Sequence, residues 1–229
     1  MVVSTIKGKK NDKHKARRDQ RREEAKKIAE QQAIVNAANA IANPLALLAP
    51  MFRKYDRNSL QVEFECDFAK NWTSEIQEWG FGITKRNMKD LYGKEWKDKE
   101  KQEEMLEDTA QYLIAKQEGS PVAFCHFRFD MDYDLAVLYC YEIQLEESVQ
   151  RKGLGRFMMQ LLELMAFQTQ MRKVILTVFH DNKAAMSFYK SKLSYSLDET
   201  SPSAVDVEWE VNYEILSKPI KSKQSSIAA

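Results

Sequence analysis

The sequence predicts an α/β protein in which a mixed β-sheet is flanked by helices and preceded by an N-terminal helical extension. In "LQVEFECDF", residues 60–68, apolar and polar residues alternate, which is typical of a half-buried strand. Three strand-like segments joined by short polar turns follow at 111–117, 122–131 and 136–145. Helical and strand patterns then alternate, so the second half has the order β-β-β-α-β-α-β-β, which favours a sheet covered by helices.

Helix-forming residues dominate the N-terminal segment. Residues 16–42 contain no Gly or Pro, and Asn43-Pro44 is expected to end this helix. Further helices are expected at 71–80, 84–92 and 98–110. They lie between the strand at 60–68 and the meander formed by the three strands from 111 to 145.

After the meander, segments with the hydrophobic period of a helix alternate with segments that have the pattern of a strand. Apolar residues from Leu154 to Met165 recur at intervals of three and four, so an amphipathic helix is expected there. The nearly continuous apolar run "KVILTVF", 173–179, suits a central strand parallel to its neighbour. The remaining elements are a helix and two strands, expected at 182–193, near Tyr195 and at 207–216.

Length and composition favour one domain with an extension. The chain has 229 residues, of which 44% are hydrophobic, enough for a full core. Neither a membrane-spanning apolar run nor the apolar core of a secretory signal is seen, so an intracellular protein without membrane attachment is expected. The three cysteines lack CxxC spacing and the three histidines are scattered, so neither a disulfide framework nor a metal site is indicated.

Charge is distributed unevenly along the chain. Residues 1–27 contain eleven Lys/Arg and four Asp/Glu, whereas the rest of the chain holds 24 basic and 30 acidic residues. A basic arm of this kind is typical of nuclear import or weak nucleic-acid contact, and equally of a solvated charged helix end. The acidic body favours a cationic substrate through long-range attraction.

Two glycines and three cations precede the amphipathic helix in "QRKGLGR", residues 150–156. A glycine-rich turn before a helix is a natural phosphate site, because the first backbone N–H groups of the helix are unpaired. The P-loop pattern GxxxxGK[ST] is absent, and Met158 occupies the third glycine position of the dinucleotide pattern GxGxxG. A dinucleotide loop also follows the first strand of a parallel unit, whereas this loop follows an antiparallel meander. Both classes are therefore excluded.

The hexapeptide at 150–155 fits the pattern [QR]xxGx[GA] and resembles the acetyl-CoA loop of the GNAT acetyltransferase superfamily. A second similarity is Asn182 at the start of the following helix, with Tyr189 two turns later. The resemblance implies the GNAT fold, acetyl-CoA as cosubstrate and no metal. It also implies that Asn182 contacts the pantetheine arm and that Tyr189 is a candidate acid for the departing thiolate. The alternatives are an N-cap for Asn182 and a core aromatic for Tyr189.

A longer resemblance covers about residues 52–216. The segments "FRFDMDYDLAVLYCYEIQLE", "NMKDLYGKEWKDKEKQEEM", "ILTVFHDN" and "TSPS" closely resemble the N-alpha-acetyltransferase D (NatD) family, whose members acetylate the N-terminal serine of histone H4 and of the A-type H2 histone. The resemblance implies direct transfer in a ternary complex, the Ser-Gly-Arg-Gly tails of these histones as partners, no obligate auxiliary subunit, and a location in nucleus and cytoplasm.

The resemblance also assigns site residues. Acetyl-CoA is expected to be held by Ile143, Gln144, Leu145, Arg151, Lys152, Gly153, Leu154, Gly155, Arg156 and Asn182. The substrate peptide is expected at Tyr92, Trp96, Asp130, Met131, Asp132, Tyr141, Thr177, Thr200 and Tyr213. Catalysis is assigned to Glu142 as the favoured general base, with Tyr139 and Tyr141 beside it. The chain departs from the family in a short segment before Trp96 and in the loop 204–212, so the register of Trp96 and Tyr213 stays open.

The expected chemistry is consistent with these residues. An N-terminal amine has a pKa of about 8, so roughly a tenth of it is neutral at pH 7 and a modest base acting through a water is enough. Strict alternation along the strand places Tyr139 and Tyr141 on one face and Glu142 on the other. All three can serve one site only if the strand bulges there.

The expected organisation is a basic arm at 1–27, a helix and linker at 28–50, the acetyltransferase domain at 51–218 and a polar tail at 219–229. Two other functions stay open at this stage. One is a lysine or small-amine acetyltransferase of the same fold, and the other is a catalytically dead module that binds CoA or histone tails.

Overall fold

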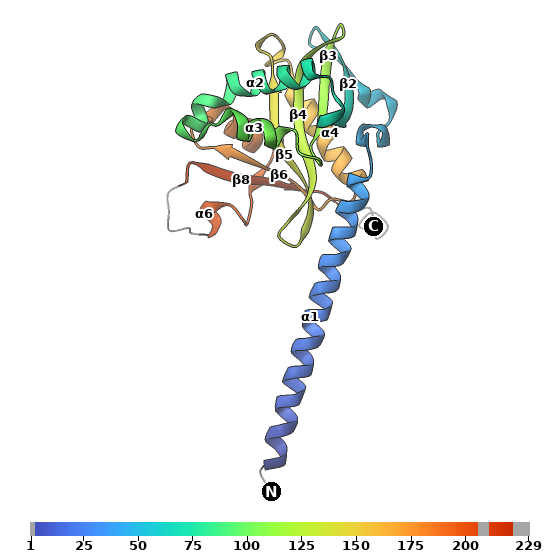
Figure 1. The fold of residues 1–229 in the computed structure, drawn as a ribbon, viewed down its shortest axis with the longest axis vertical. Helices are drawn as coiled ribbons and strands as arrows, with labels where there is room; N and C mark the ends of the chain where they lie inside the picture. Colours follow the sequence, from blue (N-terminus) through green and yellow to red (C-terminus); the bar gives the residue numbers. More distant parts are fainter. Residues whose placement is uncertain (1–2, 206–210, 222–229) are drawn as a thin grey trace.

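The computed structural model describes residues 3–205 and 211–221, and its centre is a mixed β-sheet (Figure 1). Within these residues the sheet has eight strands in the order β1-β2-β3-β4-β5-β6-β8-β7. The strands are β1 (Lys54–Arg57), β2 (Leu60–Phe68), β3 (Gln111–Gln117), β4 (Ser120–Asp132), β5 (Leu135–Leu145), β6 (Lys173–Phe179), β7 (Ser196–Leu197) and β8 (Tyr213–Pro219). Strands β5 and β6 pair in parallel and the other neighbours pair antiparallel. The predicted mixed α/β architecture is confirmed.

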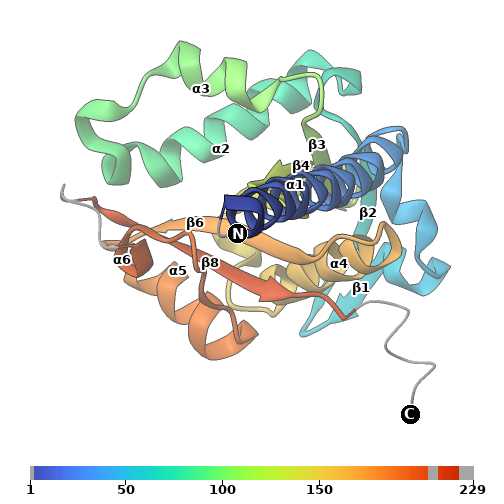
Figure 2. The same cartoon turned by 90° about the horizontal axis from the view of Figure 1, so that it is seen from below.

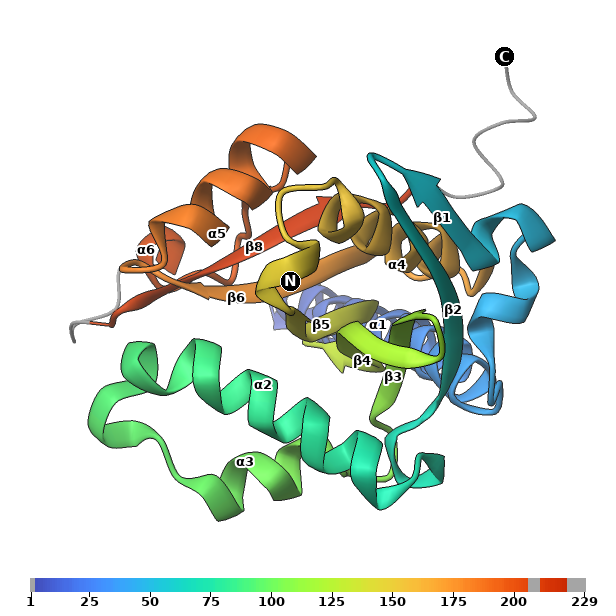
Figure 3. The ribbon, with the colours of Figure 1, turned by 90° about the horizontal axis from the view of Figure 1, so that it is seen from above.

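Helices cover both faces of this sheet. They are α1 (Val3–Asn39), α2 (Ser74–Tyr92), α3 (Asp98–Met105), α4 (Leu154–Gln168), α5 (Lys183–Ser187) and α6 (Pro202–Val205), with a π-helix at Phe188–Lys192 and short 3₁₀ helices at Pro44–Leu47, Pro50–Arg53, Ala69–Asn71, Gly93–Glu95 and Glu147–Val149. Helices α2 and α3 lie on one face, and α4 and α5 on the other (Figures 2 and 3). The larger apolar core lies on the α4 face, and a smaller one lies under α2 and α3.

Burial along the strands follows the sequence pattern. In β2 buried and exposed residues alternate, as expected for a half-buried strand, and the central strand β6 is mostly buried. Strand β1 was not predicted, because its four residues are mostly charged and Tyr55 is the buried one. Part of the strand expected at 207–216 lies outside the described residues, and β8 continues to Pro219.

Two helix predictions are wrong. Helix α2 is continuous through Gly80 and Gly82, where a break between two helices was expected. A glycine inside a helix costs about 1 kcal/mol relative to alanine, but burial of Ile83 against the sheet offsets this cost. Helix α3 ends at Met105 and not at residue 110 as expected. At its observed end, Arg128 of β4 donates a hydrogen bond to the carbonyl of Glu104.

Helix α1 projects away from the domain (Figure 1). It ends at Asn39, slightly before the expected end, and Asn43 then caps the next 3₁₀ helix by accepting a hydrogen bond from the N–H of Ala46. Val35 and Ala38 join the larger core, so the C-terminal end of α1 is held by the sheet. Among the described helices, none has both the length and the apolarity to span a membrane.

Candidate active site

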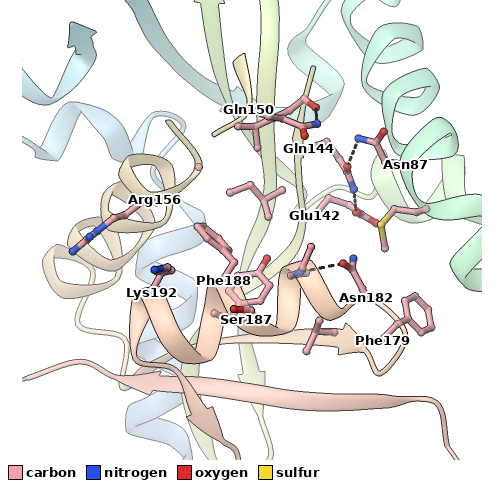
Figure 4. Close-up of a pocket in the computed structure, with 18 of the residues that line it drawn as sticks. Asn87, Glu142, Gln144, Gln150, Arg156, Phe179, Asn182, Ser187, Phe188 and Lys192 are labelled. Atoms are coloured by element: carbon pink, nitrogen blue, oxygen red, sulfur yellow. Dashed lines mark hydrogen bonds between the residues drawn. The ribbon is translucent and has the colours of Figure 1, made fainter. Parts of the chain in front are cut away.

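A cavity of about 650 Å³ opens where β5 and β6 diverge (Figure 4). Their parallel pairing ends at Cys140 and Leu176. Beyond this point β5 continues along β4 to Leu145, and β6 continues along β8 to Phe179. Within the described chain, the facing edges of the two strands therefore lack a strand partner and present backbone groups to a ligand, although the carbonyl of Leu145 already accepts a hydrogen bond of 3.0 Å from Gln150.

The glycine loop forms one wall of this cavity. Arg151 and Gly153 have φ values of 59° and 85°, so the loop turns twice through left-handed conformations that favour glycine. Tyr55 donates a hydrogen bond of 2.5 Å to the carbonyl of Lys152, and Asn58 donates one of 2.9 Å to the same oxygen. A Cβ atom at Gly153 would lie 2.8 Å from the Tyr55 hydroxyl, so this close approach also requires glycine.

Most of the predicted cofactor residues lie around the cavity. Those that line it are Ile143, Gln144, Leu145, Arg151, Gly153, Gly155, Arg156 and Asn182. Leu154 instead buries its side chain in the larger core, so it can offer only its backbone to the cavity. Lys152 is held through its carbonyl, as described above.

Asn182 is an N-cap and Tyr189 is a core aromatic, the structural roles that the sequence left open beside their expected roles toward the cofactor. The Oδ1 atom of Asn182 accepts a hydrogen bond of 3.1 Å from the N–H of Ala185, so Asn182 is the N-cap of α5. Tyr189 is buried in the larger core, with its ring 5.9 Å from that of Tyr195. Both residues also line the cavity, so their expected roles toward the cofactor stay predictions.

A β-bulge in β5 brings the three predicted catalytic residues to one face. On β4, Phe127 pairs with Cys140 and His126 pairs with Glu142, so Tyr141 is the extra residue of the bulge. The ring of Tyr141 stacks on that of His126 at 4.9 Å and lies 4.7 Å from the ring of Tyr139. Because His126 is also opposite Glu142, Tyr139, Tyr141 and Glu142 share the α2 face of the sheet. The expected bulge is therefore present.

The carboxylate of Glu142 is almost completely buried and held at both oxygens. Its Oε1 atom lies 2.6 Å from Nζ of Lys101, and the two side chains are 3% and 7% exposed. Its Oε2 atom accepts a hydrogen bond of 2.8 Å from Gln144, whose own oxygen accepts one of 2.9 Å from Asn87 (Figure 4). Glu142 still lines the cavity, so a water in the cavity can reach it.

Three predicted peptide residues lie together on the aromatic side of the site. The Tyr139 hydroxyl is 2.6 Å from that of Thr177, and burial raises the pKa of Tyr139 to about 12. Tyr92 packs edge-on against Phe179 at 4.8 Å and against Trp96 at 5.4 Å. These contacts connect the end of α2 with the end of β6 and place Tyr92 and Trp96 beside the divergence of the strands.

The acidic residues lie farther along β4. Asp130 is exposed and four residues from His126, which places it roughly 13 Å along the strand from Glu142 and on the same face. Asp132 is two residues farther and already paired with Lys173 at 2.8 Å. Met131 points to the other face and its half-buried side chain packs against the larger core, so its expected contact with the peptide stays a prediction.

Two further peptide residues lie near this acidic end and near β6. The Thr200 hydroxyl donates a hydrogen bond of 2.7 Å to Asp198, which also pairs with Lys173. Tyr213 begins β8 and pairs with Phe179 of β6. Thr200 therefore belongs to the Asp132 end of the site, and Tyr213 to the end near Tyr92.

Several cavity residues were missed by reasoning from the sequence. Asn87 and Met88 line the cavity and belong to the segment "NMKDLYG". This segment contributed to the family resemblance, but the resemblance did not identify these two positions as site residues. Phe188 and Lys192 project from the π-helix, whose wider turn cannot be placed by a pattern with a period of 3.6 residues. Figure 4 shows Lys192 on the same side of the cavity as Arg156, which adds a cation to that wall.

Comparison with known proteins agrees with this geometry. The profile of a family described as "Acetyltransferase (GNAT) family" matches residues 74–195. This segment runs from the start of α2 to just after the π-helix, so it contains the diverging strands, the bulge and the glycine loop. It is more than half of the 229 residues.

Solved structures share the same arrangement of strands and helices. An acetyltransferase of the GNAT family from Staphylococcus aureus has a TM-score of 0.54 and 11% identity, with 69% of this chain and 99% of that chain covered. The PaiA N-acetyltransferase of Thermoplasma acidophilum, in complex with coenzyme A, has a TM-score of 0.50 and 14% identity, with 69% and 99% covered. An acetyltransferase from Streptococcus agalactiae has a TM-score of 0.52 and 14% identity, with 69% and 98% covered. At these identities the likeness shows the fold alone.

Proposed function

Since this chain belongs to the GNAT acetyltransferase family, we propose that it transfers the acetyl group of acetyl-CoA to the N-terminal amine of a protein. The substrate favoured by its resemblance to the NatD family is the Ser-Gly-Arg-Gly terminus of histone H4 and of the A-type H2 histone. The observation that carries the proposal is the bulge at Tyr141, which brings Tyr139, Tyr141 and Glu142 to one face beside the cavity.

The cavity suits acetyl-CoA in shape and charge. The glycine loop and the first turn of α4 offer backbone N–H groups to a pyrophosphate, and Arg151, Arg156 and Lys192 add countercharge. The edge of β5 from Tyr141 to Leu145 lacks a strand partner and can pair with the amides of the pantetheine arm, as a strand edge pairs with an extended peptide. The Leu145 carbonyl is the exception, because it accepts a hydrogen bond from Gln150. Coenzyme A is also the ligand of the Thermoplasma acidophilum structure.

The residues at the bulge can carry the proton transfers. Glu142 takes the proton of the amine through a water, and the neutral nitrogen attacks the thioester carbonyl. The C–N bond forms and the C–S bond breaks, the nitrogen gives up its second proton, and the thiolate takes up one proton, so that one proton is released in the overall reaction. Burial raises the pKa of Tyr189 well above its usual value, which keeps its hydroxyl protonated but makes it a weak acid. Loss of the Tyr189 hydroxyl should therefore slow the reaction less than loss of the Glu142 carboxylate.

The position of Asp130 fits an arginine as the third residue of the substrate. An extended peptide advances by about 3.4 Å per residue, so the third Cα lies roughly 7 Å from the first, and an arginine side chain adds a similar reach. The sum is close to the roughly 13 Å that separates Asp130 from the level of Glu142. Asp130 is therefore the carboxylate we assign to this arginine, while Asp132 is already paired with Lys173.

The other features of the assignment rest on the resemblance and on composition. We propose that the enzyme acts without an obligate auxiliary subunit, in the nucleus and the cytoplasm. The basic arm at 1–27 is proposed to serve import or weak contact with nucleic acid. Localisation of a fluorescently tagged chain with and without residues 1–27, and its retention on a duplex DNA column at rising salt, test these roles separately.

A peptide assay separates the proposed reaction from acetylation of lysine. Two peptides with the first twenty residues of a Ser-Gly-Arg-Gly histone tail are compared, one with a free N-terminus and one with a chemically blocked N-terminus. We expect rapid transfer to the free peptide and little to the blocked one. Efficient transfer to lysine in the blocked peptide would overturn the assignment in favour of a lysine acetyltransferase.

Replacement of Glu142 by Gln separates the enzyme from an inactive binding module. The substitution keeps the shape of the side chain and removes the base, so kcat should fall by about 10² to 10⁴ while the Kd for acetyl-CoA stays within about threefold. An inactive module would show the same background transfer before and after the substitution.

A further inference from the structure

A lysine on a different layer of the fold contacts the proposed base. Lys101 lies on α3, and its Nζ atom is 2.6 Å from Oε1 of Glu142. We infer that Lys101 is a positioning residue for the reaction: it fixes the orientation of the Glu142 carboxylate, and its charge acts on the proton transfer to that carboxylate. The inference rests on the proposed function, in which Glu142 is the general base.

The geometry gives Lys101 control of one of the two carboxylate oxygens. Gln144 holds the other oxygen at 2.8 Å and is itself held by Asn87 of α2 at 2.9 Å. Helices α2 and α3 thus hold the carboxylate from two directions. Each carboxylate oxygen can accept about two hydrogen bonds, so one position on each is left for a water in the cavity.

Lys101 is a cation in this setting, although it is buried. Burial alone would lower the pKa of Lys101, but the charges of Glu142 and Glu104 raise it above its usual value. Its Nζ atom lies 2.7 Å from Glu104 and donates a hydrogen bond of 3.2 Å to the Tyr92 hydroxyl. One ammonium therefore serves two carboxylates, and the cluster is net negative, which favours the approach of a protonated amine.

Other titratable groups also face this cluster, from every element packed on it. They are Glu104 of α3, Tyr92 of α2, Tyr112 of β3, His126 and Arg128 of β4, Tyr141 of β5 and Tyr189 of the π-helix. Burial, with the charges of Arg128 and Lys101, lowers the pKa of His126 well below its usual value, so this ring is neutral. Arg128 is paired with Glu107, and burial raises the pKa of each phenol. Lys101 and Glu104 are thus the charges that act most directly on Glu142.

The two charges act on Glu142 with opposite signs. A cation beside a carboxylate favours its ionised form, and a second carboxylate disfavours it. Removal of the Lys101 charge should therefore move the acid limb of the pH profile of kcat/KM to higher pH. Removal of the Glu104 charge should move the same limb to lower pH. If Lys101 served only to stabilise the fold, its removal would leave the acid limb at the same pH.

The test is the pH dependence of kcat/KM for an N-terminal serine peptide, measured with wild type, Lys101→Met, Lys101→Arg and Glu104→Gln. We expect Lys101→Met to raise the midpoint of the acid limb by about one pH unit and to lower kcat at pH 7 at least tenfold. Lys101→Arg keeps the charge, so its limb should stay near that of wild type. Glu104→Gln should shift the midpoint down, and this prediction holds even if Lys101→Met fails to fold.

The matched control is Lys99→Met, because Lys99 is on the same helix but exposed and paired only loosely with Glu103. Its profile should equal that of wild type. An unshifted acid limb in folded Lys101→Met, or in Glu104→Gln, overturns the inference while leaving the proposed function intact. If the wild-type enzyme does not acetylate the peptide, the proposed function fails. The side-chain ¹³C signal of the Glu142 carboxylate, assigned with Glu142→Gln, then still reports whether Lys101→Met changes the surroundings of this group.

Discussion

Replacement of Gly153 by alanine tests whether the glycine loop is held in place by β1. Alanine at φ 85° costs about 1 to 2 kcal/mol, because a left-handed conformation crowds its Cβ. The same Cβ would lie 2.8 Å from the Tyr55 hydroxyl, and relief of such a contact typically costs about 1 to 3 kcal/mol. We therefore expect Gly153→Ala to lose about 2 to 5 kcal/mol, divided between the free energy of unfolding and the free energy of CoA binding.

A second substitution separates the two causes. Tyr55→Phe alone removes the hydrogen bond to the carbonyl of Lys152 and should cost about 1 kcal/mol. In the double variant the atoms nearest to the new Cβ are Nδ2 of Asn58 at 3.5 Å and Cζ of residue 55 at 3.9 Å, both ordinary contacts. The double variant should therefore lose about 1 to 3 kcal/mol less than the sum of the single losses.

The assay is urea unfolding together with calorimetric titration of CoA, applied to wild type, both single variants and the double variant. Glycine at 119 also has a positive φ but opens onto free space, so Gly119→Ala is the control for conformational strain alone. Strict additivity of the two losses would refute the proposed contact between Tyr55 and the loop.

Three other predictions concern the acidic end, the pH dependence of stability and the basic arm. Asp130→Asn should raise KM for a Ser-Gly-Arg-Gly peptide about tenfold and leave KM for a Ser-Gly-Ala-Gly peptide unchanged; equal effects on both peptides would exclude Asp130 as the partner of the arginine. Burial alone would raise the pKa of Asp198, but hydrogen bonds from Lys173, Ser217 and Thr200 lower it to about 2. The ionised Asp198 should thus stabilise the fold by up to ~2 kcal/mol above about pH 4, and this contribution should disappear as the pH falls toward 2. In Asp198→Asn the free energy of unfolding should depend less on pH in this window. Deletion of residues 1–27 should leave kcat/KM for the peptide within about twofold, because the described side chains of this segment are exposed, and a large loss would show that the arm takes part in the reaction.

The fold was predictable where a local pattern encodes it. Strands β3 and β6 have the expected bounds, 111–117 and 173–179, because alternation and continuous apolarity are local properties of the chain. The loop at 150–156 was also recognisable, because glycine and cations before an apolar helix have a direct physical meaning.

The rest of the site depends on contacts between distant segments. Lys101 meets Glu142, and Tyr55 meets Lys152, across layers that no local pattern connects. The need for a bulge followed from alternation, but the register that places it at Tyr141 comes from pairing with β4. For Met131, the family resemblance of its segment did not indicate the face of the sheet to which the side chain points.

One competition experiment tests the central claim most directly. A peptide with the first twenty residues of histone H4, carrying a free N-terminal serine and its natural lysines, is incubated with the enzyme and acetyl-CoA, and fragmentation mass spectrometry locates the first acetyl group. The account predicts that at low conversion nearly all product carries the acetyl group on the N-terminal nitrogen, and that Glu142→Gln removes this product. An acetyl group found mainly on lysine, with the serine amine free, would contradict it.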